Sequence, residues 1–295
     1  MTDIFTAIGI VLVVSLTLGL LVARSPQPSG VWRTAAMAIL LIGAFGNVFY
    51  STGLIVWARY IPHSAVIVWA NVVPIAAAIS AGLAYRLPNT PHWRQLLASG
   101  LLGLLSFGTV FWPLQGFILR PPQPGGNTWS QGVALQTSWS SCSPAAAATL
   151  LRANGVDVDE SDLMTACLTD NRGTVSLGLY RGVKLFADAN DLEVEIVPPS
   201  LDQLIIDDQW PVLLMVRLPK TGVEDPRYEH NWGWIPGLGH SVVCFGRLPN
   251  GNFIVGDPSI GREQWTTEDM KILWHGDGIR LHKRGEPFDA NAPKH

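Results

Sequence analysis

A cysteine at the start of an alanine-rich segment is the first residue that could carry out a reaction. Cys142 lies in "LQTSWSSCSPAAAATLL", residues 135–151, and the run after it has the composition of a helix. Backbone N–H groups and the positive end of a helix dipole stabilise a thiolate, which is the nucleophilic form. We expect Ser143 to cap this helix and Pro144 to be its first residue. A cysteine among small residues can also be a core residue, so a catalytic role for Cys142 depends on whether the chain supplies a base and other partners for it.

His240 is the best candidate for a base, because it opens a predicted strand whose neighbour ends in a carboxylate. The strand in "HSVVCFGRL" is followed by the turn signal "LPNG", residues 248–251, and by a second strand that ends at Asp257. A turn on the last two of these residues places Asp257 opposite Cys244, and a four-residue loop places it opposite Val242. Both positions are an even number of residues from His240. We therefore expect the two side chains to share one face of the sheet.

Gln136 completes the candidate site. Its side-chain amide, six residues before Cys142, can join the Cys142 N–H in holding a developing oxyanion. A carboxylate at Asp257 can accept from one ring nitrogen of His240 and leave the other facing the thiol. Each residue has an ordinary structural explanation when it is taken singly. Their combination favours catalysis by a nucleophilic thiol.

The second half of the chain has helical patterns first and strand patterns later. This order predicts an α+β fold with an antiparallel sheet rather than a doubly wound one. The expected helices cover 144–152, 159–168 and 176–189, and the expected strands cover 192–197, 211–218, 240–248, 252–257 and 278–282.

Residues 130–282 resemble the double-glycine leader peptidases, the papain-like cysteine peptidases fused to bacteriocin ABC exporters. The likeness rests on the spacing from Gln136 to Cys142, the "PAA" that follows, "RGTVSLGLYRGVKLF" at 172–186, His240, and Asp257-Pro258. It implies a papain-like domain in which a helical subdomain meets an antiparallel sheet, with the site between them.

The resemblance also implies a role for each residue of the site. Cys142 would be the nucleophile, His240 the general base and acid, Asp257 the residue that orients His240, and Gln136 the oxyanion donor. The chain departs from the family at Ser143, where members usually have glycine. It also contains no G-x-x-x-x-G-K-[ST] motif, so it is not itself an ABC exporter.

The first 120 residues have a different composition from the rest. They carry six arginines and one acidic residue, which leaves 14 basic and 22 acidic side chains for residues 121–295 out of totals of 20 and 23. An apolar run of about 20 residues spans a hydrocarbon core of about 30 Å. We predict a four-helix transmembrane domain over residues 1–120, although buried helices of a soluble domain are the alternative. The predicted spans are 4–23, 34–58, 64–85 and 95–119.

Arginine placement predicts the orientation. The first and third loops hold two arginines each and the second holds one, which puts both termini outside. The protein would then be a multi-pass protein of a bacterial inner membrane with an extracytoplasmic peptidase domain. The reverse topology, a cytoplasmic domain that trims export leaders for a separate transporter, is an alternative.

Proline and glycine mark the boundary between the two halves. Residues 121–130, "PPQPGGNTWS", read as a linker before a peptidase domain at 131–284, and residues 285–295 read as a disordered tail. The pair Gly125-Gly126 resembles a double-glycine cleavage site, but a flexible hinge is the simpler interpretation.

The sequence indicates few partners. It shows no metal-ligand spacing and indicates no cofactor, and the acidic second half argues against nucleic acid. The expected partners are a peptide or protein substrate and the lipid bilayer, with a separate exporter as a further candidate. Cys167 and Cys244 read as core residues. The rival to an enzyme is a catalytically silent peptide-binding or sensor module on a membrane anchor.

Overall fold

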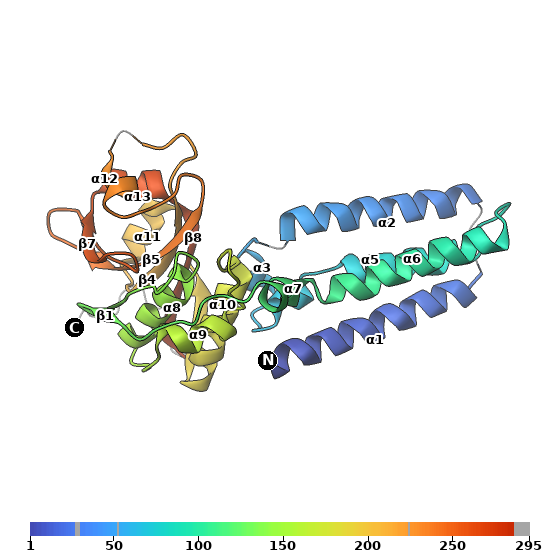
Figure 1. Ribbon diagram of the computed structural model, residues 1–295, viewed down its shortest axis with the longest axis horizontal. Coiled ribbons are helices and arrows are strands. Elements are labelled where there is room, and N and C mark those ends of the chain that lie inside the picture. Colours follow the sequence, from blue (N-terminus) through green and yellow to red (C-terminus); the bar gives the residue numbers. More distant parts are fainter. Residues whose placement is uncertain (27–29, 52, 224, 286–295) are drawn as a thin grey trace. The chain divides into compact units, whose positions relative to one another are not determined.

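The computed structural model describes residues 1–26, 30–51, 53–223 and 225–285 (Figure 1). The predicted tail, apart from its first residue, lies outside this part. Contacts divide the chain into two units: a helical unit, Met1–Trp57 with Ser64–Gln115, and a sheet unit, Ala58–His63 with Gly116–His295.

The helical unit is built around one central helix. The helix α5 packs against α1, α2 and α6. Gly82 of α5 allows the close approach of α1, because a Cβ there would lie 2.4 Å from the carbonyl oxygen of Gly19. The helices are α1 (Thr2–Arg24), α2 (Gly30–Ser51), α4 (Val66–Trp69), α5 (Val73–Ala84) and α6 (His92–Val110), with α3 (Trp57–Tyr60) and α7 (Trp112–Leu119) at the unit boundaries.

Three segments of this unit are long and apolar enough to cross a membrane: Thr2–Arg24, Gly30–Val48 and Val66–Ala84. A fourth exists if α6 and α7, which are bent by 63°, count as one span. The expectation of four continuous spans was therefore wrong in detail, since the second predicted helix ends at Ser51 rather than at 58.

The third predicted span is interrupted between α4 and α5, and Asn71 explains the break. Its Nδ2 donates to the carbonyl of Thr109 on α6 at 2.8 Å, and its Oδ1 accepts the N–H of Val73 at 3.2 Å. A side-chain amide thus supplies partners for backbone groups at the break and in the neighbouring helix. Asn71 marks a contact between helices.

The sheet unit contains one six-stranded antiparallel sheet with the strand order β3-β8-β4-β5-β6-β7. This confirms the mixed fold of helices and antiparallel sheet. The strands are β3 (Leu192–Ile196), β4 (Val212–Arg217), β5 (Gly239–Arg247), β6 (Phe253–Asp257), β7 (Gly261–Trp265) and β8 (Trp274–Lys283), and a separate hairpin joins β1 (Trp129–Ser130) to β2 (Val133–Ala134).

Helices cover the sheet on both faces. The helix α8 packs on β5, and its run of four alanines is fully buried, so that its backbone lies close to the sheet. On the opposite face, Leu214 and Val242 join a core with Leu204 of α11 and Met270 of α13. The helices of this unit are α8 (Cys142–Ala153), α9 (Glu160–Ala166), α10 (Ser176–Ala189), α11 (Leu201–Asp207), α12 (Arg227–His230) and α13 (Thr267–Leu273).

The predicted linker, residues 121–130, belongs to the sheet unit and is packed rather than free. The N–H of Gly126 donates to Oε2 of the buried Glu160 at 2.7 Å, and a Cβ on Gly125 would lie 2.8 Å from Cα of Ser161. The glycine pair is therefore a close-packed contact with α9, where the sequence suggested a flexible hinge.

Candidate active site

Cys142 is the first residue of α8, and a serine turn leads into it. Ser141 is the N-cap, so the prediction of Ser143 as the cap and Pro144 as the first residue was wrong by two positions. The Ser141 hydroxyl does not cap the helix. It accepts instead from the N–H of Ser138 at 3.0 Å. The backbone N–H groups of Cys142 and Ser143 in the first turn therefore have no side-chain cap in the described part of the chain.

His240 and Asp257 meet across the hairpin of β5 and β6, with Nε2 of the imidazole 2.7 Å from Oδ1 of the carboxylate. The observed loop, residues 248–252, is one residue longer than the four-residue alternative predicted, and this alone would put the two side chains on opposite faces. The strand pairing skips one residue between Cys244 and Gly246, and this bulge returns the side chains of His240 and Asp257 to the same face of the sheet. Continued by one step, the observed register places Asp257 opposite Val242, one of the two predicted positions.

Asp257 is fully buried and accepts from three donors. Its Oδ1 accepts from His240 and from the N–H of Ser259 at 2.8 Å, and its Oδ2 accepts from Nε1 of Trp234 at 2.9 Å. Burial alone would raise the pKa of the carboxyl group, but His240 and the other donors bring it below the ordinary value. The residue is therefore an ionised carboxylate that fixes the imidazole.

Cys142 and His240 are coupled electrostatically, because each shifts the pKa of the other. Because Asp257 occupies Nε2, the ring nitrogen left for the thiol is Nδ1. Burial raises the pKa of the Cys142 thiol, yet His240 and hydrogen bonds from Ser143 and the Ser241 backbone lower it below 9.0 overall. Burial lowers the pKa of His240, yet Asp257 and Cys142 together raise it to about 10. The pair is arranged as a thiolate and an imidazolium.

Ser143, the departure from the family pattern, is held beneath the site. Its hydroxyl lies 2.9 Å from that of Ser241 on β5, and both side chains are buried. Its Oγ is 4.0 Å from Sγ of Cys142. A serine fits at this position because β5 supplies a matching hydroxyl.

Gln136 lies beside the turn that follows Asp257. Its N–H donates to the carbonyl of Pro258 at 2.9 Å, and its Oε1 accepts from the Ser259 hydroxyl at 3.4 Å. Among the described residues no hydrogen bond engages its Nε2. The structure therefore places Gln136 against the loop that holds Asp257, with its amide donor unused, and its role in an oxyanion hole stays a prediction.

Trp234 is the member of the site that the sequence did not indicate. Besides donating to Asp257, its ring lies 4.6 Å from the His240 ring, centroid to centroid. It also packs against Tyr228, Trp232 and Trp265, which keeps it 6% exposed. The only signal was the tryptophan-rich stretch before β5. Trp234 therefore contacts both the imidazole and the carboxylate of the site.

The other two cysteines are core residues, as expected. Cys167 and Cys244 are buried free thiols, and burial raises the pKa of each to about 12. Within the described part of the chain, no group of three or more His, Cys, Asp or Glu side chains is placed to hold a metal ion.

No family model and no curated protein sequence matches this chain. Solved structures do. The peptidase domain of Streptococcus ComA, a bi-functional ABC transporter involved in a quorum-sensing pathway, is 21% identical with a TM-score of 0.40, over 52% of this chain and 98% of that one. A double-glycine motif protease from an AMS/PCAT transporter, in complex with a leader peptide, is 15% identical with a TM-score of 0.40, over 56% and 98%.

A third structure is the N-terminal peptidase C39-like domain of the toxin secretion ATP-binding protein from Vibrio parahaemolyticus. It is 12% identical with a TM-score of 0.36, over 50% of this chain and all of that one. These are peptidase domains of the family that the residue pattern resembles.

Proposed function

We propose that this protein is a membrane-anchored cysteine peptidase. The observation that carries the proposal is the linked arrangement of Cys142, His240 and Asp257, in which a buried carboxylate fixes an imidazole and the imidazole engages a thiol at a helix N-terminus. Lowered thiol pKa and raised imidazole pKa are what a nucleophile paired with a base requires.

The chemistry follows from these positions. The Cys142 thiolate attacks a peptide carbonyl, and its own N–H with Nε2 of Gln136 stabilises the resulting oxyanion. The His240 imidazolium gives its proton to the leaving amine, which departs and leaves a thioester on Cys142. The neutral His240 then takes a proton from water, hydroxide attacks the thioester, and the acid product leaves. Asp257 keeps the imidazole in one orientation throughout.

The residue pattern also suggests the substrate class. Because residues 130–282 resemble double-glycine leader peptidases, we propose peptides that are cleaved after a Gly-Gly pair. Ser143 is compatible with an enzyme, since its hydroxyl is engaged by that of Ser241 on β5.

The exposed surface of the helical unit supports the anchor. Large apolar side chains of three helices face outward, among them Val13, Leu16, Ile39 and Leu104, each at least 65% exposed. An exposed apolar surface of this kind is stable in lipid and unstable in water. Because the candidate spans contain a single carboxylate, Asp3 in the first turn of α1, we propose that they hold the chain in a membrane.

A cleavage assay tests the proposal. The full chain in neutral detergent is incubated with a peptide mixture that includes Gly-Gly and matched Ala-Ala sequences, and products are identified by mass spectrometry. We expect cleavage by the wild type and by Cys244→Ala, which removes a thiol outside the site, and none by Cys142→Ala. Binding of peptides without cleavage by the folded wild type would favour the silent module instead.

A further inference from the structure

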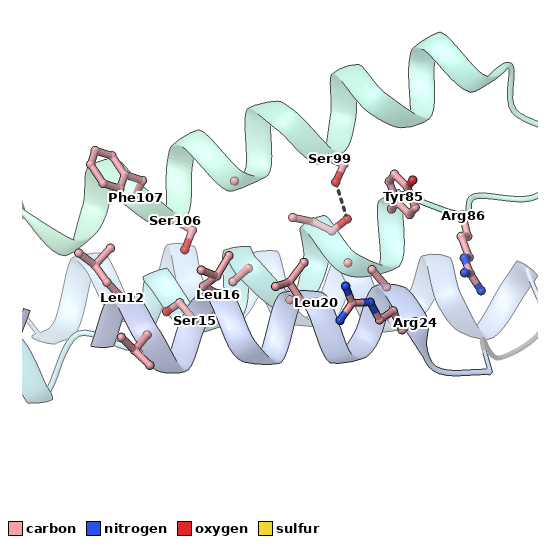
Figure 2. Close-up of a pocket in the computed structure, with 17 residues that line it drawn as sticks. Leu12, Ser15, Leu16, Leu20, Arg24, Tyr85, Arg86, Ser99, Ser106 and Phe107 are labelled. Atoms are coloured by element: carbon pink, nitrogen blue, oxygen red, sulfur yellow. Dashed lines mark hydrogen bonds between the residues drawn. The ribbon is translucent and has the colours of Figure 1, made fainter. Parts of the chain in front are cut away.

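The helical unit contains a groove that the peptidase chemistry does not use. It runs between α1 and α6 with α5 as its floor and has a volume of about 930 Å³ (Figure 2). Its lining is mostly apolar and includes Leu12, Leu16, Leu20, Ala81 and Phe107. An open apolar groove between candidate membrane spans needs an apolar occupant.

Two of the three serine hydroxyls that line the groove are engaged by backbone carbonyls, whereas that of Ser15 is buried and has no partner in the part of the chain that the structure describes. The Ser99 hydroxyl donates to the carbonyl of Ala81 at 2.9 Å, and the Ser106 hydroxyl donates to the carbonyl of Pro74 at 2.7 Å. An occupant with its own polar groups would find few partners along this wall. A hydrocarbon chain needs none.

One end of the groove is positively charged. Figure 2 shows Arg24, Tyr85 and Arg86 gathered there, and both arginine side chains are exposed. In the part of the chain that the structure describes, neither guanidinium pairs with a carboxylate. The first 120 residues contain a single acidic residue, Asp3, near the opposite end of α1. The charge at this end therefore calls for an anion from outside the chain.

The length of the groove matches one leaflet of a bilayer. From Leu12 to Arg24 the helix rises about 18 Å at about 1.5 Å per residue, whereas half of a hydrocarbon core is about 15 Å. When α1 spans the bilayer, the arginines lie at the depth of the headgroups and Leu12 lies near the midplane.

We propose that this groove binds an anionic phospholipid, with an acyl chain along α1 and α6 and the phosphate held by Arg24 and Arg86. The inference rests on the membrane anchoring proposed above, but not on peptidase activity. A helix of another protein is the rival occupant. The mostly apolar wall and the two arginines without a carboxylate partner among the described residues favour the lipid.

Two glycines of α6 provide a matched test of the groove. A Cβ on Gly103, which lines it, or on Gly100, which does not, would meet no atom within 4 Å. Gly103→Phe therefore fills the groove without a clash at Cβ, and Gly100→Phe adds the same ring elsewhere on the same helix. Arg24→Gln/Arg86→Gln removes the charge and leaves the groove open.

The experiment is native mass spectrometry of the purified full chain in neutral detergent, titrated with dioleoyl phosphatidylglycerol or dioleoyl phosphatidylcholine. Two arginines should give the wild type a preference of about tenfold or more for the anionic lipid. We expect the double arginine variant to lose this preference, Gly103→Phe to bind both lipids more weakly, and Gly100→Phe to resemble the wild type.

Three results would overturn the inference: equal binding of the two lipids by the wild type, unchanged binding by Gly103→Phe, or binding of inorganic phosphate as tight as that of the anionic lipid. A dimer that Gly103→Phe abolishes would assign the groove to a second helix. A failure of the proposed membrane anchoring would be recognised by a different result, since the chain would then leave the membrane fraction without detergent. Peptide cleavage by the same samples reports independently on the proposed activity.

Discussion

Nε2 of His240 lies 2.7 Å from Oδ1 of Asp257 because a single bulge in β5 turns the two side chains to the same face of the sheet. Without the residue skipped between Cys244 and Gly246, the observed loop would set Asp257 opposite Val243, an odd number of positions from His240. The relationship on which the proposed chemistry depends is therefore created by one irregularity in an otherwise regular hairpin.

The pKa directions predict how Cys142 reacts with iodoacetamide as the pH changes. The thiol pKa lies below 9.0, so lowering the pH from 9.0 leaves the thiolate intact until that lower pKa is reached. In His240→Ala the charge that lowers the pKa of the Cys142 thiol is gone and burial remains, so this pKa should rise. The alkylation rate at neutral pH should then fall by about tenfold for each pH unit by which the thiol pKa increases. Intact-mass kinetics measure this rate.

Cys167 and Cys244 provide the internal control, since burial raises the pKa of both to about 12. One adduct per folded chain, located at Cys142 by peptide mapping, is expected. Equal labelling of the three cysteines in the folded protein would contradict the assigned environments.

Asp257→Asn should separate the orientation of the imidazole from its charge. The amide removes the negative charge that raises the pKa of His240 to about 10, so that pKa should fall toward 6.5. The turnover number should drop on the order of 10²–10⁴-fold, the range of general acid–base catalysis. The alkaline limb of the pH–rate profile gives the pKa, and a limb that stays near pH 10 would contradict the role of Asp257.

Trp234→Phe tests the indole donor that holds the second oxygen of Asp257. Hydrogen bonds to charged groups contribute about 1.5–3 kcal/mol, so activity should fall about 10- to 100-fold while the protein stays folded. Trp232→Phe is the matched control, because Trp232 belongs to the same aromatic cluster without bonding to Asp257. If both variants lose the same activity, Trp234 acts only through packing.

Gln136→Ala should lower the turnover number by about 10²–10³-fold with little change in peptide binding, as expected for a lost oxyanion donor. Gln136→Glu keeps the size and removes the donor, so it should be equally impaired. A variant in which only the Michaelis constant changes would place Gln136 in substrate binding instead.

The sequence predicted those helices and strands whose bounds follow from the spacing of small and apolar residues. The helix at Ser176–Ala189 has the predicted bounds, and the strands around His240 and Asp257 lie where alternation placed them. The strand β7 was missed because its interior, Arg262 to Gln264, is polar at the edge of the sheet. The sequence also did not predict the bulge in β5 or the extra residue in the loop. Each of the two alone would move His240 and Asp257 to opposite faces of the sheet, and together they cancel. The prediction that the two side chains share a face was therefore correct, although the loop length behind it was not.

Other features depend on tertiary contacts that no local pattern encodes. Trp234 reaches Asp257 across 23 positions of the chain. The N-cap of α8 is Ser141 rather than the predicted Ser143. The Ser141 hydroxyl bonds within the turn before the helix, and the Ser143 hydroxyl bonds to that of Ser241. The predicted third span broke at Asn71, whose partner Thr109 lies on another helix.

Trapping of the covalent intermediate tests the central claim most directly. The full chain is mixed with a cleaved peptide, quenched in acid within the first turnover, and measured by intact mass and peptide mapping. The account predicts an adduct with the mass of the N-terminal product, joined to Cys142 and absent from Cys142→Ala. Undiminished cleavage by Cys142→Ala, or an adduct on another residue, would contradict it.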